Sequence, residues 1–468
     1  MQPQKIQLPT NPYRKIIATN IDYYGLFLEL ENQFNDCYLF ESLSDEKRKD
    51  LQTSFGFNPL FTVKARGNNL YFDGNLKMLG TNESSLVIYC DNPYRYLQSI
   101  FPNPIKCKTR EGGLIGYVSY EAINYFEPSL DLNEHPDFHQ FNFGFYDHGL
   151  IYNSIANELE YYYYFEDKSE VVKKILDNLQ SHQYHNFNNN LEIIDNGSDI
   201  TKSEYESIMK SVFSEIQKGN TFQVEVGMKN KYQIIGRKMK IYNHLRNINP
   251  SPYMIYVKSG NEEIIGASPE ILISCTNNYV MTMPTAGTVA RGSNEAEDQQ
   301  LTNEMLEDKK EVAEHSMLVD LHRNDLGKIA KLDSVGVEEL MHIIKFSHVQ
   351  HIVSKIVCQK DEQYDSFDIL ASILPGGVLT GVPKIETMKI ISRNEPEPRG
   401  PYGGAVGRFS FNGDCAFALP IRTLFCSGDS CFTQTCSGVV LDSIIENEYN
   451  EIQNKVTAMK LSIMKSKD

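Results

Sequence analysis

The chain lacks any apolar run of about 18 residues, the length that a helix needs to cross a membrane. Its start, Met-Gln-Pro-Gln-Lys-Ile-Gln-Leu-Pro, also lacks the apolar stretch of a secretory signal peptide. The nine cysteines are an odd number, occur singly and show no C-x-x-C spacing, which indicates reduced, unpaired thiols. We therefore expect a cytoplasmic protein without a membrane span.

Positive charge is scarce as well. The 468 residues include 45 Lys and Arg against 61 Asp and Glu, which gives a formal net charge of −16. This balance argues against nucleic acid as a partner, because phosphates need a basic footprint. It does not exclude a small anionic substrate, since a bound metal ion and one or two arginines can reverse the local field.

The length allows two to four domains, and hydrophobic residues at 41% are enough for sizeable cores. Residues 1–190 favour strands, with hairpin turns at residues 67–69 (Gly-Asn-Asn) and 156–158 (Ala-Asn-Glu) between apolar segments. Residues 181–199 are rich in Asn, His and Gln and poor in apolar side chains, which predicts a linker. The sequence thus predicts an N-terminal domain over residues 1–190 and a second domain over residues 200–468.

Helices and strands alternate in the second part. A capping box at residues 201–204 opens a helix that Gly219 ends. From Ala405 onward, apolar segments separated by turn residues 412–413 and 427–430 predict an antiparallel meander. Further helices are expected at residues 296–325, 365–374, 384–393 and 445–465. The pattern indicates an α+β chain whose large antiparallel sheets are each covered by helices on one side.

Two pairs of carboxylates recur at helical spacing. Glu311 and Glu314 are one turn apart, and the predicted helix becomes apolar directly after them. Glu448 and Glu451 repeat the spacing on a predicted helix near the C-terminus. Like charges at this spacing repel each other, and burial raises the cost. Two such helices could hold one cation between them, and oxygen ligands without nearby thiols favour Mg²⁺.

Residues 374–384 (Leu-Pro-Gly-Gly-Val-Leu-Thr-Gly-Val-Pro-Lys) form a glycine-rich segment that opens a helix. A nucleotide P-loop requires Lys-Ser or Lys-Thr after its last glycine, and Val-Pro-Lys stands here instead. Backbone N–H groups at a helix start still suit a carboxylate, and Lys384 adds positive charge. The alternative is a plain turn with Pro383 at the first helical position.

Other residues indicate anion binding or proton transfer. Arg422 is predicted inside an apolar strand, where an arginine is usually paired, and a substrate carboxylate is one candidate partner. The Tyr402 hydroxyl could donate to the same carboxylate. His342, His348 and His351 cluster after a helix, but they lack a zincin pattern and a third ligand at useful spacing for zinc. A buried core histidine and a proton-exchanging one both remain open for His351.

Four segments in this order carry a family resemblance: residues 284–288 (Pro-Thr-Ala-Gly-Thr), 314–327 (Glu-His-Ser-Met-Leu-Val-Asp-Leu-His-Arg-Asn-Asp-Leu-Gly), 374–384, and 399–407 (Arg-Gly-Pro-Tyr-Gly-Gly-Ala-Val-Gly). They resemble the chorismate-utilising enzymes and, within that family, the anthranilate synthase large subunits (component I). The resemblance covers residues 200–468 strongly and the N-terminal part weakly. It implies two large antiparallel sheets packed face to face, with helices on the outside.

The resemblance also assigns residues to a site. It implies that His351 is the catalytic histidine and that Glu270, in Gly-Ala-Ser-Pro-Glu, protonates a departing ring hydroxyl. The other implied positions are the Mg²⁺ ligands Glu311, Glu314, Glu448 and Glu451, which hold the ring carboxylate; Tyr402, Arg422 and Gly438, which bind the enolpyruvyl carboxylate; and the further substrate-binding residues Thr288, Gly376, Gly377 and Lys384.

The chain departs from the family pattern at three places. Val378 stands where the family usually has Thr, and residues 222–229 (Phe-Gln-Val-Glu-Val-Gly-Met-Lys) lack the usual Ser-Arg end. Arg408 replaces a common Tyr. These departures change details of binding and leave the implied metal ligands and His351 in place.

The activity that the resemblance implies is the Mg²⁺-dependent conversion of chorismate and ammonia to anthranilate and pyruvate, the first step of tryptophan biosynthesis. None of the cysteines lies in Gly-x-Cys-x-Gly, so a separate glutamine amidotransferase subunit would have to supply the ammonia. The chain has no tryptophan beside 27 Tyr and 24 Phe. An enzyme that makes tryptophan could therefore still be translated during tryptophan starvation.

Two related activities and one without catalysis are the alternatives. Aminodeoxychorismate synthases typically carry Lys where this chain has Ala286. Isochorismate and salicylate synthases place a Lys, as the base for water, at the position aligned with Gln223. Both residues favour ammonia as the direct nucleophile. Outside catalysis, the alternative is an inactive sensor that binds tryptophan.

Two short segments predict feedback inhibition by L-tryptophan. Residues 38–42 (Tyr-Leu-Phe-Glu-Ser) resemble the Leu-Leu-Glu-Ser element of tryptophan-sensitive enzymes of the family, and residues 249–254 (Asn-Pro-Ser-Pro-Tyr-Met) resemble its Pro-Tyr-Met partner. The implied tryptophan-binding residues are Leu39, Glu41, Ser42, Pro252, Tyr253 and Met254. The carboxylate and hydroxyl of this set would bind the ammonium group, and the apolar members would face the indole. The alternative is that both segments are ordinary strand and core.

Overall fold

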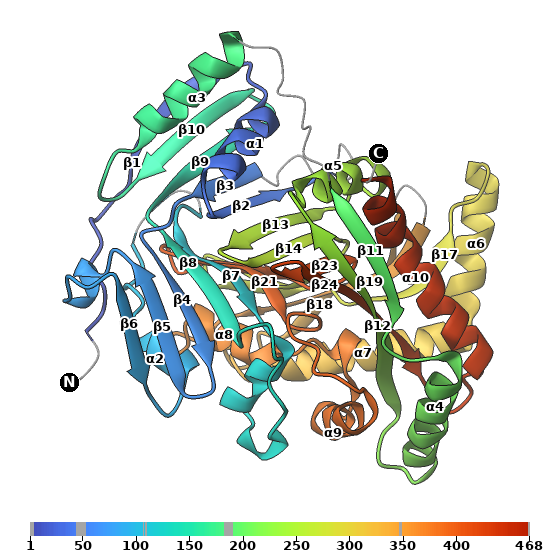
Figure 1. The fold of residues 1–468 in the computed structure, drawn as a ribbon. Coiled ribbons are helices and arrows are strands. Elements are labelled where there is room, and N and C mark those ends of the chain that lie inside the picture. The colour runs from blue at the N-terminus through green and yellow to red at the C-terminus, as the bar shows by residue number, and fades with distance from the viewer. Residues whose placement is uncertain are drawn as a thin grey trace.

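The computed structural model describes residues 4–43, 53–105, 107, 110–181, 191–345 and 349–466. The strands of these residues form two twelve-stranded sheets, and their neighbouring strands run antiparallel (Figure 1). The helices lie outside the sheets, and short 3₁₀ turns connect some elements. The 3₁₀ turns are Lys77–Leu79, Tyr120–Tyr125, Pro128–Leu130 and Gly377–Leu379.

The first sheet contains the C-terminal hairpin among its inner strands. Its order is β1 (Tyr13–Thr19), β10 (Glu158–Tyr163), β9 (His148–Asn153), β3 (Thr53–Phe57), β2 (Asp36–Glu41), β13 (Tyr253–Ser259), β14 (Glu262–Ser268), β23 (Thr423–Ser427), β24 (Ser430–Val439), β12 (Gln223–Ile235) and β11 (Glu192–Ser198), and β20 (Gly381–Val382) also pairs with β12.

The second sheet has the same size. Its order is β17 (Thr285–Ala290), β19 (Val349–Gln359), β16 (Tyr279–Thr282), β15 (Ile271–Thr276), β22 (Cys415–Ala418), β21 (Ala405–Ser410), β7 (Gly113–Val118), β8 (Phe141–Tyr146), β4 (Phe61–Arg66), β5 (Asn69–Gly74) and β6 (Ser85–Tyr89), and β18 (Gly336–Lys345) also pairs with β19.

Ten α-helices are found in the described residues. They are α1 (Tyr23–Gln33), α2 (Pro93–Ile100), α3 (Ser169–Ser181), α4 (Lys202–Gln217), α5 (Met239–Ile248), α6 (Glu295–Glu307), α7 (Lys309–Gly327), α8 (Ser366–Ile373), α9 (Lys384–Asn394) and α10 (Ile445–Lys465). None of them combines the length and the apolar character that a membrane-spanning helix requires.

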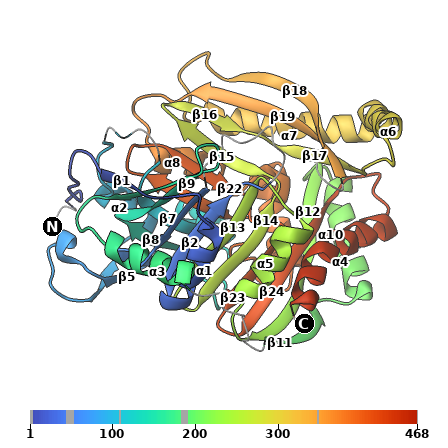
Figure 2. The ribbon, with the colours of Figure 1, turned by 90° about the horizontal axis from the view of Figure 1, so that it is seen from above.

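One apolar core joins the inner faces of the two sheets. Ile255, Ile264 and Phe425 of the first sheet lie in the same buried cluster as Phe143 and Phe409 of the second. A second cluster fills the space between the first sheet and α1, α3, α5 and α10. Figure 2 shows α5 and α10 beside the first sheet and α7 beside β17 and β19 of the second. The predicted fold class is therefore confirmed.

Strands from both halves of the chain share both sheets. In the first sheet β2 pairs with β13, and in the second β7 pairs with β21. Residues 192–198, assigned to a linker from their composition, form β11, so that part of the prediction is wrong. An edge strand is held by backbone bonds to its one neighbour and needs few apolar side chains. Residues 182–190 lie outside the described residues, and the division into 1–190 and 200–468 stays a prediction.

The predicted C-terminal meander is split between the sheets. β21 and β22 pair in the second sheet, whereas β23 and β24 pair in the first. The chain crosses over at residues 419–422, because Pro420 cannot donate an N–H to a ladder. Arg422, expected inside a strand, lies at the end of this crossing with a left-handed φ of 52°. Few residues other than glycine adopt this conformation, and it often marks a functional position.

Local signals in the sequence were more reliable. Thr201 and Glu204 form both bonds of the predicted capping box, and the two predicted hairpins are β4–β5 and β9–β10. The helix expected at residues 296–325 is two helices, because Asp308 caps a new one through the N–H groups of Lys310 and Glu311. The break sets the position from which α7 presents its carboxylates.

Candidate active site

His351 is placed by the pairing of β17 with β19, in which it lies opposite Thr288. Its Nδ1 is 3.2 Å from the Gly287 carbonyl and 3.0 Å from the Thr288 hydroxyl. In the tautomer whose Nδ1–H donates to the Gly287 carbonyl, Nε2 is the basic nitrogen. Burial lowers the pKa of His351 to about 4, and the positive charge of Arg422 contributes. The imidazole is therefore neutral near pH 7 and can take up a proton.

Glu270 lies at the start of β15, and its side chain is almost fully buried. One carboxylate oxygen accepts the Thr285 N–H at 3.2 Å. Burial raises the pKa of Glu270 to about 8, the Arg422 charge opposes this rise, and Glu225 adds to it. Near pH 7 this carboxyl therefore holds a proton that it can donate. The structure thus brings a buried acid and a neutral base to the same arginine.

Glu225 is a buried carboxyl of this site. The sequence marked it only as a member of residues 222–229, which depart from the family pattern. The Tyr402 hydroxyl donates to the Cys436 sulfur at 3.0 Å, and the Cys436 thiol donates to Glu225 at 3.2 Å. Gln223 donates to the other carboxylate oxygen at 3.2 Å. Burial raises the pKa of Glu225 to about 7. The available signal was an acidic residue between two valines of a buried strand.

Gly438 lies opposite Glu225 in the β12–β24 pair. A Cβ atom at this glycine would lie 2.6 Å from a carboxylate oxygen of Glu225 and 2.5 Å from the Gln223 amide nitrogen. Only glycine therefore leaves room beside these two polar groups. The position agrees with a backbone that a ligand approaches closely.

The predicted metal ligands lie on α7 and α10, which face each other across Lys310. The Lys310 ammonium is 3.7 Å from Glu314 and 3.9 Å from Glu448. Glu311 faces β17, since a Cβ at Gly287 would lie 3.0 Å from its carboxylate. The fourth carboxylate, Glu451, pairs with Lys455 at 2.7 Å.

The chemistry of this set fits a hard divalent ion. Burial raises the pKa of Glu314 to about 7, and the charges of Glu311, Glu225 and Glu448 add to the rise. A cation among these oxygens would remove the repulsion. No group of three or more metal-binding side chains is already gathered at ligand spacing in the described part of the chain. A metal would therefore need to draw the carboxylates together and displace the Lys310 ammonium.

The glycine-rich segment is fastened to α7 and to the crossing. A Cβ at Gly376 would lie 3.0 Å from Leu419, and one at Gly377 would collide with Leu321. Lys384 donates to the buried Asp325 at 2.6 Å and to a backbone carbonyl. These contacts show what holds the segment in place, and the substrate-binding roles of its residues stay predictions.

The histidines do not assemble a zinc site in the described residues. His342 lies 3.3 Å from Glu339, and the buried His315 ring is 2.6 Å from the Ser354 hydroxyl. His348 lies outside the described residues.

The two predicted tryptophan-binding segments are neighbours in the first sheet, where Glu41 pairs with Met254. Between the sheets lies a cavity of about 480 Å³, bordered by Glu41, Ser42, Pro252, Tyr253 and Met254. Leu39 does not border it. Its side chain is buried under α1 and α5, because alternate residues of a strand face opposite sides.

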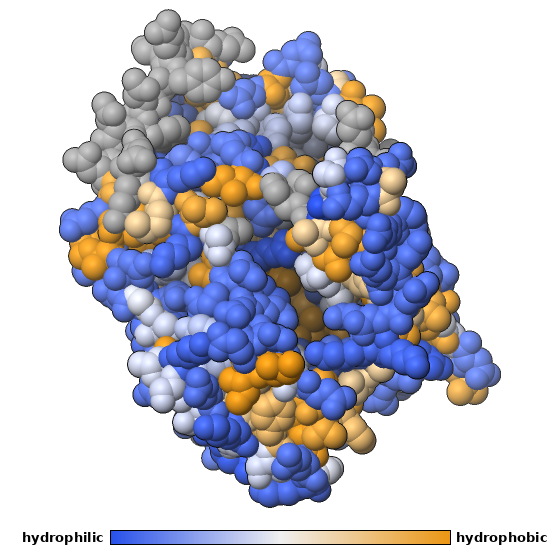
Figure 3. Space-filling view, turned by 90° about the vertical axis from the view of Figure 1, so that its right-hand side faces the viewer, coloured by the Kyte–Doolittle hydropathy of each residue, from blue (hydrophilic) through white to orange (hydrophobic). Residues whose placement is uncertain are grey.

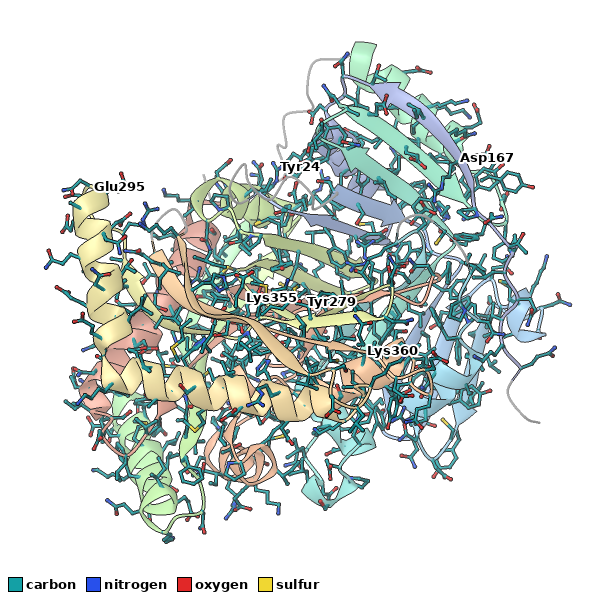
Figure 4. All side chains as sticks on the ribbon, turned by 180° about the vertical axis from the view of Figure 1, so that it is seen from behind. Tyr24, Asp167, Tyr279, Glu295, Lys355 and Lys360 are labelled. Atoms are coloured by element: carbon teal, nitrogen blue, oxygen red, sulfur yellow. The ribbon has the colours of Figure 1, made fainter. Side chains whose placement is uncertain are left out.

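Glu41 is already engaged by groups on α1 and α5. Its carboxylate accepts from the Tyr23 hydroxyl at 2.9 Å, the Tyr242 hydroxyl at 2.7 Å and the Arg246 guanidinium at 2.6 and 3.0 Å. Tyr24, labelled in Figure 4, lies under this guanidinium with 3.9 Å to its ring centroid. A ligand's ammonium group would have to share this carboxylate with Arg246.

Figures 3 and 4 view two further sides of the molecule. Figure 3 views the side that carries α6 and α10 and shows a hollow near its centre, with apolar residues inside a polar rim. In Figure 4, which views the molecule from behind Figure 1, Tyr279 and Lys355 lie on adjacent strands, and both donate to Glu338. These groups bind one another.

Comparisons with known proteins agree with this geometry. The family model described as chorismate binding enzyme matches residues 37–461. Anthranilate synthase component 1 of Leptospira biflexa is 37% identical over 463 residues, covering 98% of this chain and 97% of that protein. Aminodeoxychorismate synthase component 1 of Bacillus subtilis is 40% identical over 269 residues, covering 58% of this chain and 57% of that protein.

A solved structure is similar as well. The crystal structure of anthranilate synthase component I from Streptococcus pneumoniae TIGR4 matches with a TM-score of 0.74 at 28% identity, covering 90% of this chain and 92% of that one. Together with the paired sheets and the site between them, these similarities place the chain in the family of chorismate-binding enzymes.

The acid role of Glu270 leads to a pH prediction. In the predicted role of Glu270 as the acid, the protonated form is the active one, so the rate of chorismate consumption should fall as pH rises through about 8. Glu270→Gln should lower the rate by about 100-fold or more and remove this alkaline limb. Initial rates are measured from pH 6.5 to 9.5 at a constant concentration of free nucleophile. Glu362→Gln, at an exposed carboxylate, is the control. A normal alkaline limb in Glu270→Gln would contradict the assignment.

Proposed function

We propose that this chain is the large subunit of an anthranilate synthase, which converts chorismate and ammonia to anthranilate, pyruvate and water. The observation that carries the choice is the combination of a buried acid, Glu270, and a neutral histidine, His351, with no lysine at the positions of Ala286 and Gln223. Relatives named anthranilate synthase component 1 that match nearly the whole chain support it.

The first step places the amine on the ring. Ammonia attacks the ring carbon next to the carboxylate-bearing carbon, the double bonds shift, and the bond to the ring hydroxyl breaks. The proton of Glu270 passes to that hydroxyl, which leaves as water, and the ammonium group formed by the attack loses one proton, which restores the carboxyl. Burial favours this role, because it keeps the carboxyl protonated near neutral pH. Arg422 lies beside the acid and would hold the enolpyruvyl carboxylate.

The second step expels pyruvate. His351 takes the proton from the ring carbon that carries the new amine, and the bond between the ring and the enolpyruvyl oxygen breaks. The ring becomes aromatic, and the released enolpyruvate gains a proton to become pyruvate. The Gly287 carbonyl and the Thr288 hydroxyl keep the imidazole oriented for this transfer.

Glu311, Glu314, Glu448 and Glu451 would hold the Mg²⁺. When bound, the ion supplies positive charge that binds the ring carboxylate and offsets the acidic surroundings. In glutamine-dependent turnover, ammonia would come from a separate amidotransferase subunit in the same cytoplasmic compartment.

A second candidate is aminodeoxychorismate synthase. The Bacillus subtilis enzyme of that name is the relative with 40% identity over about half of the chain, which favours shared catalytic architecture. That reaction moves the amine to a different ring carbon. The residue at position 286 argues against it, because alanine offers no amine for a covalent ring adduct.

The product identifies the reaction. With chorismate, Mg²⁺ and an ammonium salt, we expect anthranilate, seen by its fluorescence, together with an equal amount of pyruvate. Chromatography of the same mixture separates the rival products. 4-Amino-4-deoxychorismate as the main product, or isochorismate formed without ammonia, would show that the assignment is wrong.

The metal site has its own test. Glu311→Gln combined with Glu448→Gln should abolish turnover and weaken divalent-ion binding by at least about tenfold, because charge on both helices is lost. Mn²⁺ binding followed by electron paramagnetic resonance measures the second effect directly. Glu304→Gln with Glu307→Gln on the exposed face of α6 is the matched control. Normal activity of the first double variant at limiting Mg²⁺ would exclude the four-carboxylate site.

Inhibition by tryptophan is proposed to act through the cavity between the sheets. β15 and β22 both border it and continue into Glu270 and into the crossing that ends at Arg422. A ligand there could bias the two sheets toward a less active packing, with a coupling energy of typically about 1–3 kcal/mol. Inhibition requires that tryptophan binds that packing better.

Ser42→Ala and Met254→Thr should each weaken inhibition while uninhibited turnover stays nearly unchanged. For Ser42 the loss of one hydrogen bond predicts a shift of about threefold to tenfold in the inhibitory concentration. Ser84→Ala, at an exposed loop serine, is the control. Inhibition that both variants leave unaltered, or that chorismate overcomes by pure competition, would rule the second site out.

A further inference from the structure

The cavity between the sheets contains an arginine for which the described residues provide no counter-ion. Arg408 lies on β21 opposite Ala416 and borders the cavity. Its guanidinium donates to the Ser54 hydroxyl and to the backbone carbonyl of Arg110, and it lies 5.2 Å from the ring of Phe40. The planar group has further N–H donors beyond these two bonds.

No carboxylate of the described residues forms an ion pair with Arg408, and its electrostatic neighbours are two tyrosines and Arg110. Of the two acidic residues at the cavity, Glu41 is bound by Arg246. Asp414 lies 4.0 Å from Arg110 and accepts from backbone and side-chain amides. Burial lowers the pKa of Arg408, which reflects the cost of holding this charge. A buried cation without a partner is costly, and an anionic ligand would remove that cost.

The walls of the cavity define the rest of the ligand. Pro252, Ile255, Met281 and Ile271 supply apolar surface, which suits a flat aromatic ring. The Ser42 hydroxyl borders the same space and is buried with no hydrogen-bond partner in the described structure. A volume of about 480 Å³ falls in the usual range for small-molecule sites.

We infer that Arg408 binds the carboxylate of the cavity's ligand, an aromatic amino acid whose ammonium group is turned toward Ser42. The inference rests on the proposed regulation by tryptophan and names the group that this chain uses for it. A carboxylate matches the guanidinium fork in charge and in shape, whereas an amine would be repelled by it. The tyrosine common at this position in the resembling family could offer only a hydroxyl, so the ion pair is a property of this chain.

The chain itself makes the test direct. Since it contains no tryptophan, indole fluorescence excited where tyrosine does not absorb reports only the ligand. Three probes separate the polar contacts: L-tryptophan has both charged groups, indole-3-propionate has only the carboxylate, and tryptamine has only the amine. We expect the first two to bind the full chain and tryptamine to bind at least about tenfold more weakly.

The variants make the same comparison from the protein side. Arg408→Met keeps length and should weaken tryptophan binding by about tenfold or more, whereas Arg408→Lys keeps charge and should retain part of it. Arg323→Met, which removes an exposed arginine paired with Asp320, should bind as the unaltered chain does. Circular dichroism and thermal unfolding verify that each variant is folded.

Three results would overturn the inference. Tryptamine binding as tightly as tryptophan, or full tryptophan binding in Arg408→Met, would show that Arg408 does not hold the carboxylate. Failure of all three probes to bind the unaltered chain would show that the cavity is not a ligand site. None of these results affects the test of anthranilate formation, which is measured separately from the product.

Discussion

Apolar side chains fill most of the space between the inner faces of the two sheets, so each ionisable group buried there must be paired, neutral or bound to a ligand. Most of the buried charges are paired. Arg399 bonds Glu395 at 2.6 Å, and Lys384 bonds Asp325 at the same distance. The groups that lack such a partner define the sites. Glu270 stays neutral by holding its proton, and Arg408 has no carboxylate partner among the described residues.

The crossing at residues 419–422 positions the groups of the candidate active site. It carries the chain from β22 in the second sheet to β23 in the first and ends at Arg422, which has a left-handed backbone and whose charge acts on Glu270. The glycine-rich segment packs on the same crossing through Gly376 and Leu419. Acid, arginine and loop therefore depend on one short piece of backbone, and a shift between the sheets would move them together.

Sequence reasoning succeeded where the physics is local. The capping box at residues 201–204 and both hairpin turns depend on neighbouring residues, and they formed as predicted. The carboxylate pairs predicted from their spacing lie on helices α7 and α10 as expected, and their joint role as ligands of one ion stays a prediction. Pro420 was a usable signal for the strand break that the continuous apolar run concealed.

Contacts between residues far apart in the sequence could not be predicted from it. Nothing in residues 192–198 shows that they form an edge strand, because the partner strand β12 supplies the backbone bonds. Glu225 could be identified as a site carboxyl only after Cys436 and Gly438 were seen beside it. The engagement of Glu41 by Arg246 likewise depends on α5, which is far away in the sequence. Chemistry at a pairing between distant strands is invisible until the pairing is known.

The mixing of early and late strands in both sheets has a consequence for synthesis. β2 cannot pair with β13, nor β7 with β21, until the later strand of each pair has been synthesised, and β21 is made near the end of the chain. Until then the first strands have open edges that invite pairing with other chains. Such long-range pairing also slows folding, because the chain loses the entropy of loop closure before the stabilising contacts between distant strands form. A nascent chain of this protein therefore needs protection from aggregation until almost all of it has been made.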